Sequence, residues 1–351
     1  MTRLNLGIRC QVWKLDPPFV IAGEVWPAID SVVVELVDSQ GHVGRSETQG
    51  VSYRQENFET IHAQLESVRA RIEAGVTLSG LQDILPAGGA RNALDVALWD
   101  LLSSQQSRPV HRMIGLDRLA PVETVFTIGI KSPEEAAYEA ARRPEFRQIK
   151  IKADADRHLD VIAAIRTARP DAELIVDANQ AWTFALLREL TPHLQGLNVS
   201  VIEQPLPVHE DAALEGYASP IVLMADESCQ DRSDLEAVGR RYGAVNIKLD
   251  KTGGLTEAIQ LRRDASRMGL KTMVGNMCGG SLAMAPAFLV AQLTDYTDID
   301  GPLLQTEDWP NPLRYQGGHV HAPAGPLWGG LHLAQREPAE GPGTVKETSY
   351  E

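Results

Sequence analysis

The sequence has few cysteines, no long apolar run and no excess of positive charge, and each of these absences excludes a class of protein. Only three cysteines occur among the 351 residues, and they are far apart: Cys10, Cys229 and Cys278. An odd number at wide spacing argues against a disulfide framework and is typical of reduced thiols in a cytoplasm. We therefore expect a cytoplasmic protein.

Membranes and nucleic acids are also disfavoured as partners. No stretch is apolar for long enough to cross a bilayer, and the first residues, "MTRLNLGIRCQVW", lack the apolar core of a signal peptide. The formal net charge of -14 argues against nucleic acid or an anionic membrane, because both require a basic surface. An anionic small substrate remains compatible, since a local site can be positive inside an acidic protein.

Residues 1–117 have the pattern of an α+β domain. The β-branched run "SVVVELVD" at residues 31–38 predicts a strand. Apolar residues then recur at spacings of three and four, which predicts an amphipathic helix that Gly75 closes: Phe58, Ile61, Leu65, Val68 and Ile72. A second helix is predicted over "ARNALDVALWDLLSSQ", residues 90–105. Strands followed by helices indicate an α+β capping domain.

Residues 118–320 repeat one unit eight times. Short apolar strands are predicted at "TVFTIGI", "RQIKIK", "AELIVDA", "VSVIEQ", "PIVLMADE", "AVNIKLD", "KTMVGN" and "YTDIDG". Their centres lie roughly 22 to 26 residues apart, with a helix-like segment in each gap, as in a (β/α)8-type barrel. No clear helix follows the last strand, which indicates a (β/α)7β form. The stretch "LRYQGGHVHAP" is hairpin-like, and the polar tail from Glu337 is expected to be disordered.

Carboxylates end three consecutive predicted strands. Asp177, Glu203 and Asp226 close the third, fourth and fifth strands of the repeat. Barrel enzymes place their sites at these carboxyl ends, where three neighbouring carboxylates in a partly dry cavity repel one another. A divalent cation relieves that repulsion, and all-oxygen ligation favours Mg2+, with Mn2+ as a substitute.

Lysines lie on both sides of these acids. Lys150 and Lys152 are two residues apart on the second strand and so point to the same face, while Lys248 is on the sixth strand, opposite in an eight-stranded ring. Burial near a cation would lower a lysine pKa from about 10.4 to roughly 7 or 8, which suits a base at neutral pH.

These positions predict a proton-transfer site. Lys152 and Lys248 would be the two bases, one at each face of the substrate, and Lys150 would hold a substrate carboxylate oxygen. A carboxylate on a metal makes its α-proton more acidic, so this layout would invert an α-carbon by 1,1-proton transfer through an enediolate.

The motifs as a set resemble a known family. Lys-x-Lys, Asp-x-Asn, Glu-Gln-Pro, Asp-Glu-Ser and Asn-Ile-Lys at these intervals resemble the muconate lactonizing enzyme subgroup of the enolase superfamily, over nearly the whole chain. The resemblance implies one catalytic pair, Lys152 and Lys248, and a C-terminal return to the cap within residues 321–351. It also implies Mg2+ ligands and two supporting residues: Asp177, Glu203 and Asp226, supported by Asn179 and Gln204.

Within the subgroup, three longer motifs look like those of dipeptide epimerases, above all the L-Ala-D/L-Glu epimerases. They are "PAGGARNALDVALWDL", "ADESCQDRSDLEAVGRRYGAVNIKLDKTGGLTEA" and "DIDGPLL". The resemblance implies epimerisation of the C-terminal residue of a dipeptide, with Asp298 and Asp300 holding its free α-ammonium. The resemblance is also compatible with a homo-oligomer, and we expect the protein to form one.

One segment departs from that family. In "FVIAGEVWPAID" the residues Ala22, Gly23 and Glu24 stand where the Ala-Glu enzymes carry an arginine for an acidic side chain. We expect Gly23 and Glu24 to contact substrate, and the sequence leaves open whether an apolar or a basic side chain is preferred. Cys278, in the glycine-rich "GNMCGGS", is expected in a loop that lines the substrate.

Other functions use the same residues. An N-acylamino-acid racemase, an o-succinylbenzoate synthase or a related cycloisomerase would need the same two lysines. A substrate without a free ammonium has no use for two acids, so Asp298 and Asp300 favour the dipeptide epimerase. A non-catalytic metal-binding barrel is the remaining alternative, and the presence of both lysines and all three acids argues against it.

Overall fold

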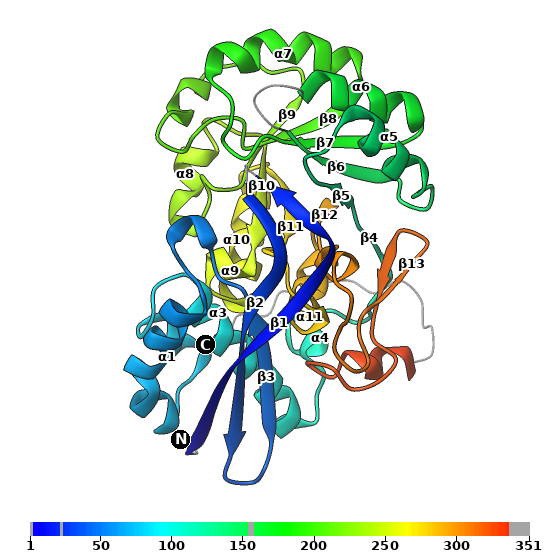
Figure 1. The fold of residues 1–351 in the computed structure, drawn as a ribbon. Coiled ribbons are helices and arrows are strands. Elements are labelled where there is room, and N and C mark those ends of the chain that lie inside the picture. Colours follow the sequence, from blue (N-terminus) through cyan, green and yellow to red (C-terminus); the bar gives the residue numbers. More distant parts are fainter. Residues whose placement is uncertain (1–2, 22–23, 154–157, 337–351) are drawn as a thin grey trace.

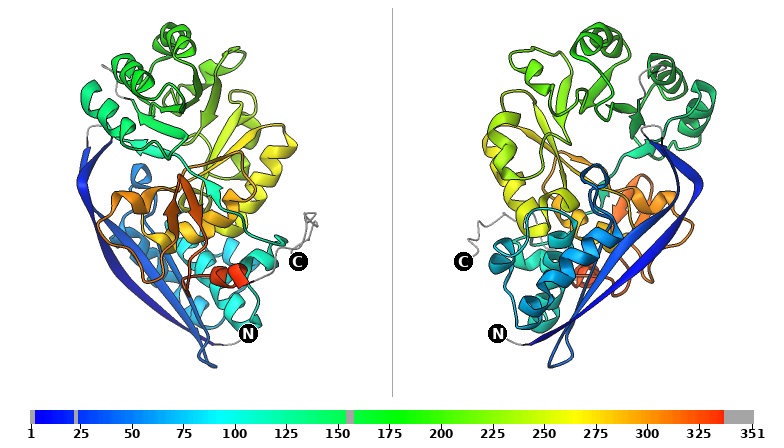
Figure 2. Two further views of the ribbon diagram at one scale, coloured as in Figure 1. Left: turned by 90° about the vertical axis from the view of Figure 1, so that its right-hand side faces the viewer. Right: turned by 60° about the vertical axis from the view of Figure 1, so that its left-hand side comes forward.

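The computed structural model describes residues 3–21, 24–153 and 158–336, which form a cap and a barrel packed together (Figure 1). The cap begins with an antiparallel sheet in the order β1-β2-β3, made of β1 (Leu4–Ile21), β2 (Glu24–Asp38) and β3 (Val43–Thr48). The predicted strand at 31–38 is confirmed as part of β2. The long β1–β2 ribbon extends along one side of the molecule toward the barrel strands (Figure 2).

Helices cover one face of this sheet. The cap contains η1 (Ser52–Arg54), α1 (Phe58–Glu73), α2 (Leu78–Gln82), α3 (Gly89–Gln106) and α4 (Val110–Met113). Helix α1 starts at a capping box in which Asn57 and Thr60 bond reciprocally, and it buries the predicted apolar stripe against the sheet. Gly44 lets α3 approach β3 closely, because a Cβ there would lie 2.1 Å from the carbonyl oxygen of Ala97. Both predicted helices are confirmed.

The barrel sheet contains eight parallel strands in chain order, and all eight predicted strands are confirmed. They are β5 (Phe126–Ile128), β6 (Gln148–Lys152), β7 (Glu173–Asp177), β8 (Val199–Glu203), β9 (Val222–Ala225), β10 (Ala244–Lys248), β11 (Lys271–Gly275) and β12 (Tyr296–Thr297). No strand ladder joins β5 to β12 among the described residues. The backbone N–H of Val125 nevertheless donates to the carbonyl of Thr297 at 3.0 Å, so the two edges of the curled sheet meet.

The segments between strands follow the prediction with one exception. The α-helices are α5 (Pro133–Ala141), α6 (His158–Ala168), α7 (Phe184–Gly196), α8 (Leu235–Val238), α9 (Leu249–Thr252), α10 (Leu255–Arg267) and α11 (Ser281–Ala291). The expectation of a helix in every gap is wrong between β8 and β9, where the described chain has only the 3-10 turn η2 (Asp211–Leu214). Pro205, Pro207 and Gly216 interrupt any helix there. Two further 3-10 turns are η3 (Arg232–Asp234) and η4 (Gly301–Leu304), the latter following β12 in place of an eighth helix.

After the barrel the chain forms the predicted hairpin and returns to the cap. The hairpin strands β13 (Arg314–Gln316) and β14 (His319–His321) continue to the short β4 (Val122–Glu123) in one sheet. The Trp328 indole N–H then donates to the Val96 carbonyl on α3 at 3.1 Å, shortly before η5 (Leu331–Arg336). The tail from Glu337 lies outside the described residues.

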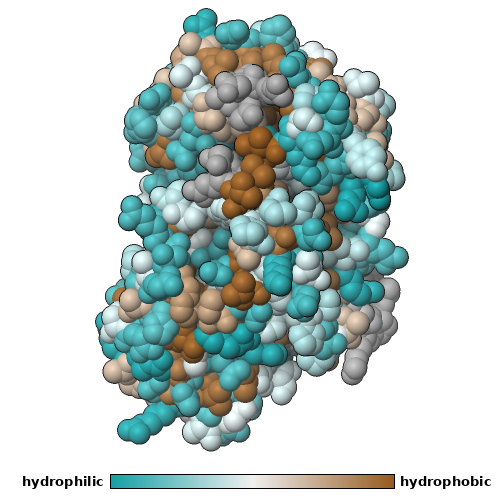
Figure 3. Space-filling view, in the orientation of Figure 1, coloured by the Kyte–Doolittle hydropathy of each residue, from teal (hydrophilic) through white to brown (hydrophobic). Residues whose placement is uncertain are grey.

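The surface is mostly hydrophilic on the face drawn in Figure 3, with short apolar strips along its middle. Two exposed apolar side chains belong to the β1–β2 ribbon, Val12 at 52% and Val25 at 63% exposure. Within the described residues, no helix is both long and apolar enough to cross a membrane.

Candidate active site

Alternation along the strands explains how charged groups reach the barrel mouth. The barrel interior contains a layer of buried residues, one from most strands: Val125, Ile175, Val201, Met224, Ala244, Met273 and Tyr296. Lys150 pairs in register with Ile175, so β6 places a lysine at this level. Two residues further along, four strands point inward again with a charged side chain: Lys152, Asp177, Glu203 and Asp226. On β10 the charged residue, Lys248, lies four residues after Ala244 and also points inward.

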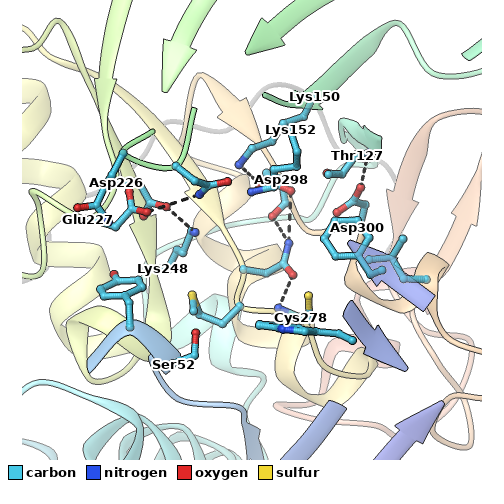
Figure 4. Close-up of a pocket in the computed structure, with 18 residues that line it drawn as sticks. Ser52, Thr127, Lys150, Lys152, Asp226, Glu227, Lys248, Cys278, Asp298 and Asp300 are labelled. Carbon is cyan, nitrogen blue, oxygen red and sulfur yellow. Dashed lines mark hydrogen bonds and ion pairs between the residues drawn. The ribbon is translucent and has the colours of Figure 1, made fainter. Parts of the chain in front are cut away.

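A cavity of about 300 Å³ lies above these residues, between the barrel and the cap (Figure 4). The barrel contributes most of the predicted site residues to its lining: Lys150, Lys152, Asn179, Asp226, Lys248, Cys278, Asp298 and Asp300. The cap contributes Phe19 and Trp26 from the β1–β2 ribbon, and Ser52 and Tyr53 from η1. Chain segments far apart in sequence thus line one cavity.

Two of the predicted lysines each pair with a predicted metal ligand. The Lys152 Nζ lies 2.7 Å from the Asp177 Oδ2, and the Lys248 Nζ lies 2.7 Å from the Asp226 Oδ2. Strands β6 and β10 are four places apart in the eight-stranded sheet, so the two lysines enter the cavity from opposed strands (Figure 4). This arrangement places one amine on each side of any molecule bound between them.

Lys150 lies deeper and connects three strands. Its side chain is 2% exposed, and its Nζ lies 2.8 Å from the Glu203 Oε2, 2.8 Å from the Asp298 Oδ2 and 3.1 Å from the Asp177 Oδ2. A buried ammonium is stable only when carboxylates surround it in this way. Lys150 therefore neutralises part of the negative charge at the cavity floor.

Lys251 is a site residue that the sequence reasoning missed. It is fully buried, and its Nζ donates to the Asp226 Oδ1 at 2.7 Å, to the Asp226 carbonyl at 2.6 Å and to the Asn246 carbonyl at 2.8 Å. The signal was present in "NIKLDK", where Lys251 follows Lys248 by three residues and α9 turns it back toward β9.

Gln204 holds the backbone around Asp226 in place. Its Oε1 accepts the backbone N–H groups of Asp226 at 2.9 Å and Ser228 at 3.1 Å. Gln204 was predicted to support the metal site, and these two hydrogen bonds fix the backbone that carries Asp226. Asn179 contributes differently: its backbone N–H donates to the Asp177 Oδ1 at 3.0 Å.

The acids of the site divide into two groups by pKa. Burial alone would raise the pKa of Asp177, but the ammonium groups of Lys152 and Lys150 lower that pKa to about 2. Burial, reinforced by Asp226, raises the pKa of Glu227 to about 7, and burial together with Asp298 raises the pKa of Asp300 to about 7. Burial and the charge of Asp177 also raise the pKa of Glu203. The cluster therefore holds more carboxyl groups than its lysines can keep ionised.

Two of the lysines have a raised pKa because of their ion pairs. Burial works to lower the pKa of Lys248, but the Asp226 carboxylate outweighs it and raises that pKa. For Lys150, the charges of Asp298, Glu203 and Asp177 likewise outweigh burial, and its pKa lies well above the ordinary value. The carboxylates that contact these two side chains favour the ammonium form, whereas the expected lowering concerns a lysine beside a bound cation and stays a prediction.

The charges of this cluster fit an additional cation. Six buried carboxyl groups gather here, against four lysines: Asp177, Glu203, Asp226, Glu227, Asp298 and Asp300 face Lys150, Lys152, Lys248 and Lys251. In the described part of the chain no group of three or more acidic, histidine or cysteine residues is arranged as metal ligands. The Lys150 ammonium contacts the carboxylate oxygens of Asp177 and Glu203. The donor set is all-oxygen and contains more carboxyl groups than ammonium groups, which suits a hard divalent cation.

The two acids after β12, Asp298 and Asp300, have different surroundings. Asp298 contacts Lys150 through its Oδ2, and its Oδ1 accepts from the Asn276 Nδ2 at 3.3 Å. The Asp300 Oδ2 accepts the backbone N–H of Thr127 at 2.7 Å. Both line the cavity, as does Cys278. Of the other predicted substrate contacts, Gly23 lies outside the described residues, and so does the side chain of Glu24.

The fold and the cavity define a capped barrel with lysines on two opposed strands at the carboxyl ends of its sheet. Comparison with known proteins gives the family. Residues 133–331 match the enolase C-terminal domain-like family, and residues 3–115 match the mandelate racemase/muconate lactonizing enzyme N-terminal domain. The chain belongs to the mandelate racemase/muconate lactonizing enzyme family of the enolase superfamily.

Individual relatives agree with this assignment. The chain is 41% identical to the L-Ala-D/L-Glu epimerase of Escherichia coli over 89% of this chain and 97% of that protein. It is 44% identical to an N-acetyl-D-glutamate racemase of a Pseudoalteromonas species over 74% of this chain and 82% of that protein. An enolase family member from Agrobacterium tumefaciens, described with bound sodium and L-Ala-L-Glu, superposes with a TM-score of 0.89 at 37% identity and covers 93% of this chain and 100% of that chain. The protein is an isomerase of the epimerase or racemase type.

Proposed function

We propose that this protein is a Mg2+-dependent dipeptide epimerase that inverts the α-carbon of the C-terminal residue. The observation that carries the proposal is the position of Lys152 and Lys248 on opposed strands, each pointing into the cavity and each beside a strand-end carboxylate. Two bases on opposite sides of one carbon suit inversion rather than addition or hydrolysis.

Asp177, Glu203 and Asp226 would hold the Mg2+. When bound, the cation would stabilise negative charge on the substrate carboxylate and compensate the carboxylates that otherwise pair with the lysines. Asp298 and Asp300 would bind the α-ammonium of the dipeptide, because two carboxyl groups at one end of the cavity attract a cation. Lys150 would stay an ammonium and hold the floor of the site in place.

The two catalytic lysines exchange roles between the two directions of reaction. One lysine, as the free amine, takes the α-proton, so that its N–H bond forms while the C–H bond breaks and the electron pair moves into the carboxylate as an enediolate. The opposite lysine, as the ammonium, delivers a proton to the other face of the same carbon. The cap would limit access of water to the reacting carbon, because Phe19, Trp26 and Tyr53 line the side of the cavity that faces the cap.

Proton exchange in D2O tests this proposal. Enzyme with Mg2+ would be incubated with pooled L,L-dipeptides and, separately, with N-acetyl and N-succinyl amino acids, and deuterium at the C-terminal α-carbon would be read by mass spectrometry. We expect incorporation in free dipeptides that disappears in the Lys152→Ala Lys248→Ala double variant. Incorporation in no dipeptide would overturn the proposal.

An N-acylamino-acid racemase is the second candidate, and one observation favours it. Asp298 is already paired with Lys150 and Asn276, while the raised pKa of Asp300 allows its protonated form near neutral pH. A protonated Asp300 can donate a hydrogen bond to an acyl carbonyl oxygen. Exchange confined to N-acylated substrates would support this candidate in place of the dipeptide epimerase.

The proposed setting is the cytoplasm. Cys10, Cys229 and Cys278 are all free thiols, which is typical of proteins in a reducing compartment.

A further inference from the structure

The turn that follows β10 carries charged side chains to two different parts of the molecule. Lys248 is the last residue of β10 and the N-cap of α9, and α9 buries both Asp250 and Lys251. Lys251 bonds to Asp226 in the barrel. Asp250 bonds instead to the cap, and it is not among the residues that line the cavity. Lys248 is therefore followed directly by a turn that is tied to both the barrel and the cap.

Asp250 joins the barrel to one segment of the cap, residues 48–50. Its Oδ1 accepts the Thr48 hydroxyl and the backbone N–H groups of Gln49 at 3.1 Å and Gly50 at 2.9 Å. Hydrogen bonds to an ionised carboxylate are stronger than those between neutral groups. Asp250 and Thr48 are both buried, so water does not compete for these bonds. The segment is thus held firmly against α9.

Segment 48–50 leads into the wall of the active-site cavity. Ser52 and Tyr53, which follow it, line the cavity, and Ser52 enters from the cap below Lys248 in the view of Figure 4. The Tyr53 hydroxyl accepts from the Gln230 Nε2 at 3.1 Å, and Gln230 lies on the loop after β9. The cap is therefore bonded to the barrel beyond the carboxyl ends of β9 and β10, where the Lys248 ion pair is located.

The opposite base has no such connection. Lys152 and Asp177 end β6 and β7, and among the described residues no hydrogen bond joins these two strand ends to the cap. The neighbouring strand β5 does reach the cap, since the Ile130 N–H after it donates to the Val20 carbonyl at 3.1 Å, but β5 carries neither proposed base. Hydrogen bonds to the cap thus hold the strand end of one proposed base and not of the other.

The position of α9 affects Lys248 through a shared carboxylate. A helix of four residues is too short to be stable alone, so tertiary contacts set the position of α9. Lys251 on this turn bonds to one carboxylate oxygen of Asp226, and Lys248 pairs with the other. If Asp250 were lost, a shift of α9 would move Lys251 and, through Asp226, change the position of the Lys248 ammonium.

We propose that Asp250 is a positioning residue for Lys248: it holds α9 against segment 48–50 and so fixes the Lys248–Asp226 pair for proton transfer at one face of the substrate carbon. The proposal rests on the dipeptide epimerase function proposed above. It concerns one of the two bases, so the effect of losing Asp250 should differ between the two epimers of one substrate.

Exchange of the α-proton in each epimer provides the test. The L,L and L,D forms of one dipeptide would be incubated separately with enzyme and Mg2+ in D2O, and proton NMR would measure loss of the α-proton in substrate that keeps its configuration. The epimer that Lys152→Ala still exchanges is the one whose proton Lys248 takes. The readout is the ratio of the two exchange rates, which does not depend on the fraction of folded enzyme.

Three variants should change this ratio to different extents. Asp250→Ala is expected to slow exchange of the Lys248 epimer about tenfold more than exchange of the other epimer, because proton transfer depends on the placement of the base. Inversion should slow by the same factor in both directions, since each direction uses both lysines. Asp250→Asn should restore most of the ratio, because its amide oxygen can accept the same donors. Thr48→Val removes one donor from the cap side and should shift the ratio in the same direction by a smaller factor.

Asp100→Ala is the matched control. Asp100 on α3 also accepts two backbone N–H groups, from Arg45 at 2.9 Å and Gly329 at 2.6 Å, but it does not line the cavity. The Asp100→Ala variant should melt at a lower temperature while the ratio of the two exchange rates stays at its wild-type value.

An unchanged ratio in Asp250→Ala would overturn the proposal and leave Asp250 with a purely structural role. The turn should remain folded in this variant, because the Arg91 guanidinium also donates to the Thr252 carbonyl at the end of α9, at 2.7 Å. If Asp250→Ala nevertheless failed to fold, an unchanged ratio in Thr48→Val would overturn the proposal. No exchange by the wild-type enzyme with any dipeptide would overturn the proposed function instead.

Discussion

The Lys152 ammonium contacts the carboxylate of its own register partner, because Lys152 and Asp177 are paired across β6 and β7 and their side chains meet at 2.7 Å. Lys248 and Asp226 form a second contact of the same length from the other side of the sheet. Each of the two proposed bases therefore contacts one strand-end carboxylate, and the two lie on opposed strands.

Single-lysine variants should separate the two faces of the substrate. Lys152→Ala and Lys248→Ala are each expected to lower the epimerisation rate by roughly 10² to 10⁴. Each variant keeps one base, so each should still exchange the α-proton of one epimer with D2O, and the two variants should act on opposite epimers. Proton NMR of L,L and L,D dipeptides in D2O would measure this. Identical epimer preference in both variants would contradict the two-base arrangement.

Removal of divalent cations should abolish epimerisation. The excess of carboxyl groups over lysines in the cluster means that a bound divalent cation stabilises the folded protein, by about 2.7 kcal/mol at a hundredfold excess over its dissociation constant. Enzyme treated with EDTA and then dialysed should lose activity and melt at a lower temperature. Added Mg2+ should restore both, with Mn2+ as a substitute. Full activity after exhaustive chelation would rule out the metal, and calcium-free buffer with added NaCl is the control for ionic strength.

Lys251→Met should destabilise the protein through Asp226. The substitution removes a buried ammonium and leaves the Asp226 carbonyl, the Asn246 carbonyl and one carboxylate oxygen without that donor. Removing one partner of a buried ion pair lowers the free energy of unfolding by about 3 to 5 kcal/mol. Urea unfolding would measure the loss. Lys271→Met is the matched control, because the Lys271 Nζ contacts only the Tyr296 hydroxyl among described groups, at 3.3 Å, and the change should be small.

Arg169→Met should lower stability without changing the chemistry. Arg169 lies before β7, at the end of the barrel away from the cavity, and its guanidinium donates to the Arg143 and Phe146 carbonyls, each at 2.7 Å. Buried carbonyls left without donors cost about 1 to 3 kcal/mol each. We expect the free energy of unfolding to fall by about 2 to 4 kcal/mol while KM stays at its wild-type value. The exposed Arg188→Met serves as control, and a raised KM in Arg169→Met would argue against a purely structural role.

The local sequence pattern was sufficient to predict most helices and strands and the charged residues at the ends of the barrel strands. Apolar spacing of three and four defined α1, and short β-branched runs defined the barrel strands, because both depend on residues that are near in sequence. Lys152, Asp226 and Lys248 reach one cavity because side chains alternate along strands and parallel strands align their carboxyl ends. The gap between β8 and β9 was mispredicted where prolines prevented a helix.

Tertiary structure alone decided which charges meet. Nothing local indicates that Lys150 contacts Asp298, 148 residues away, or that Glu47 accepts the indole of Trp309, 262 residues away. The ionisation of the site follows from those contacts, since burial and neighbouring charge act only once the chain is folded. The sequence determined which chemical groups stand at the ends of the strands, and the folded barrel and cap decided their partners, because ion pairing depends on distance in space and not on distance along the chain.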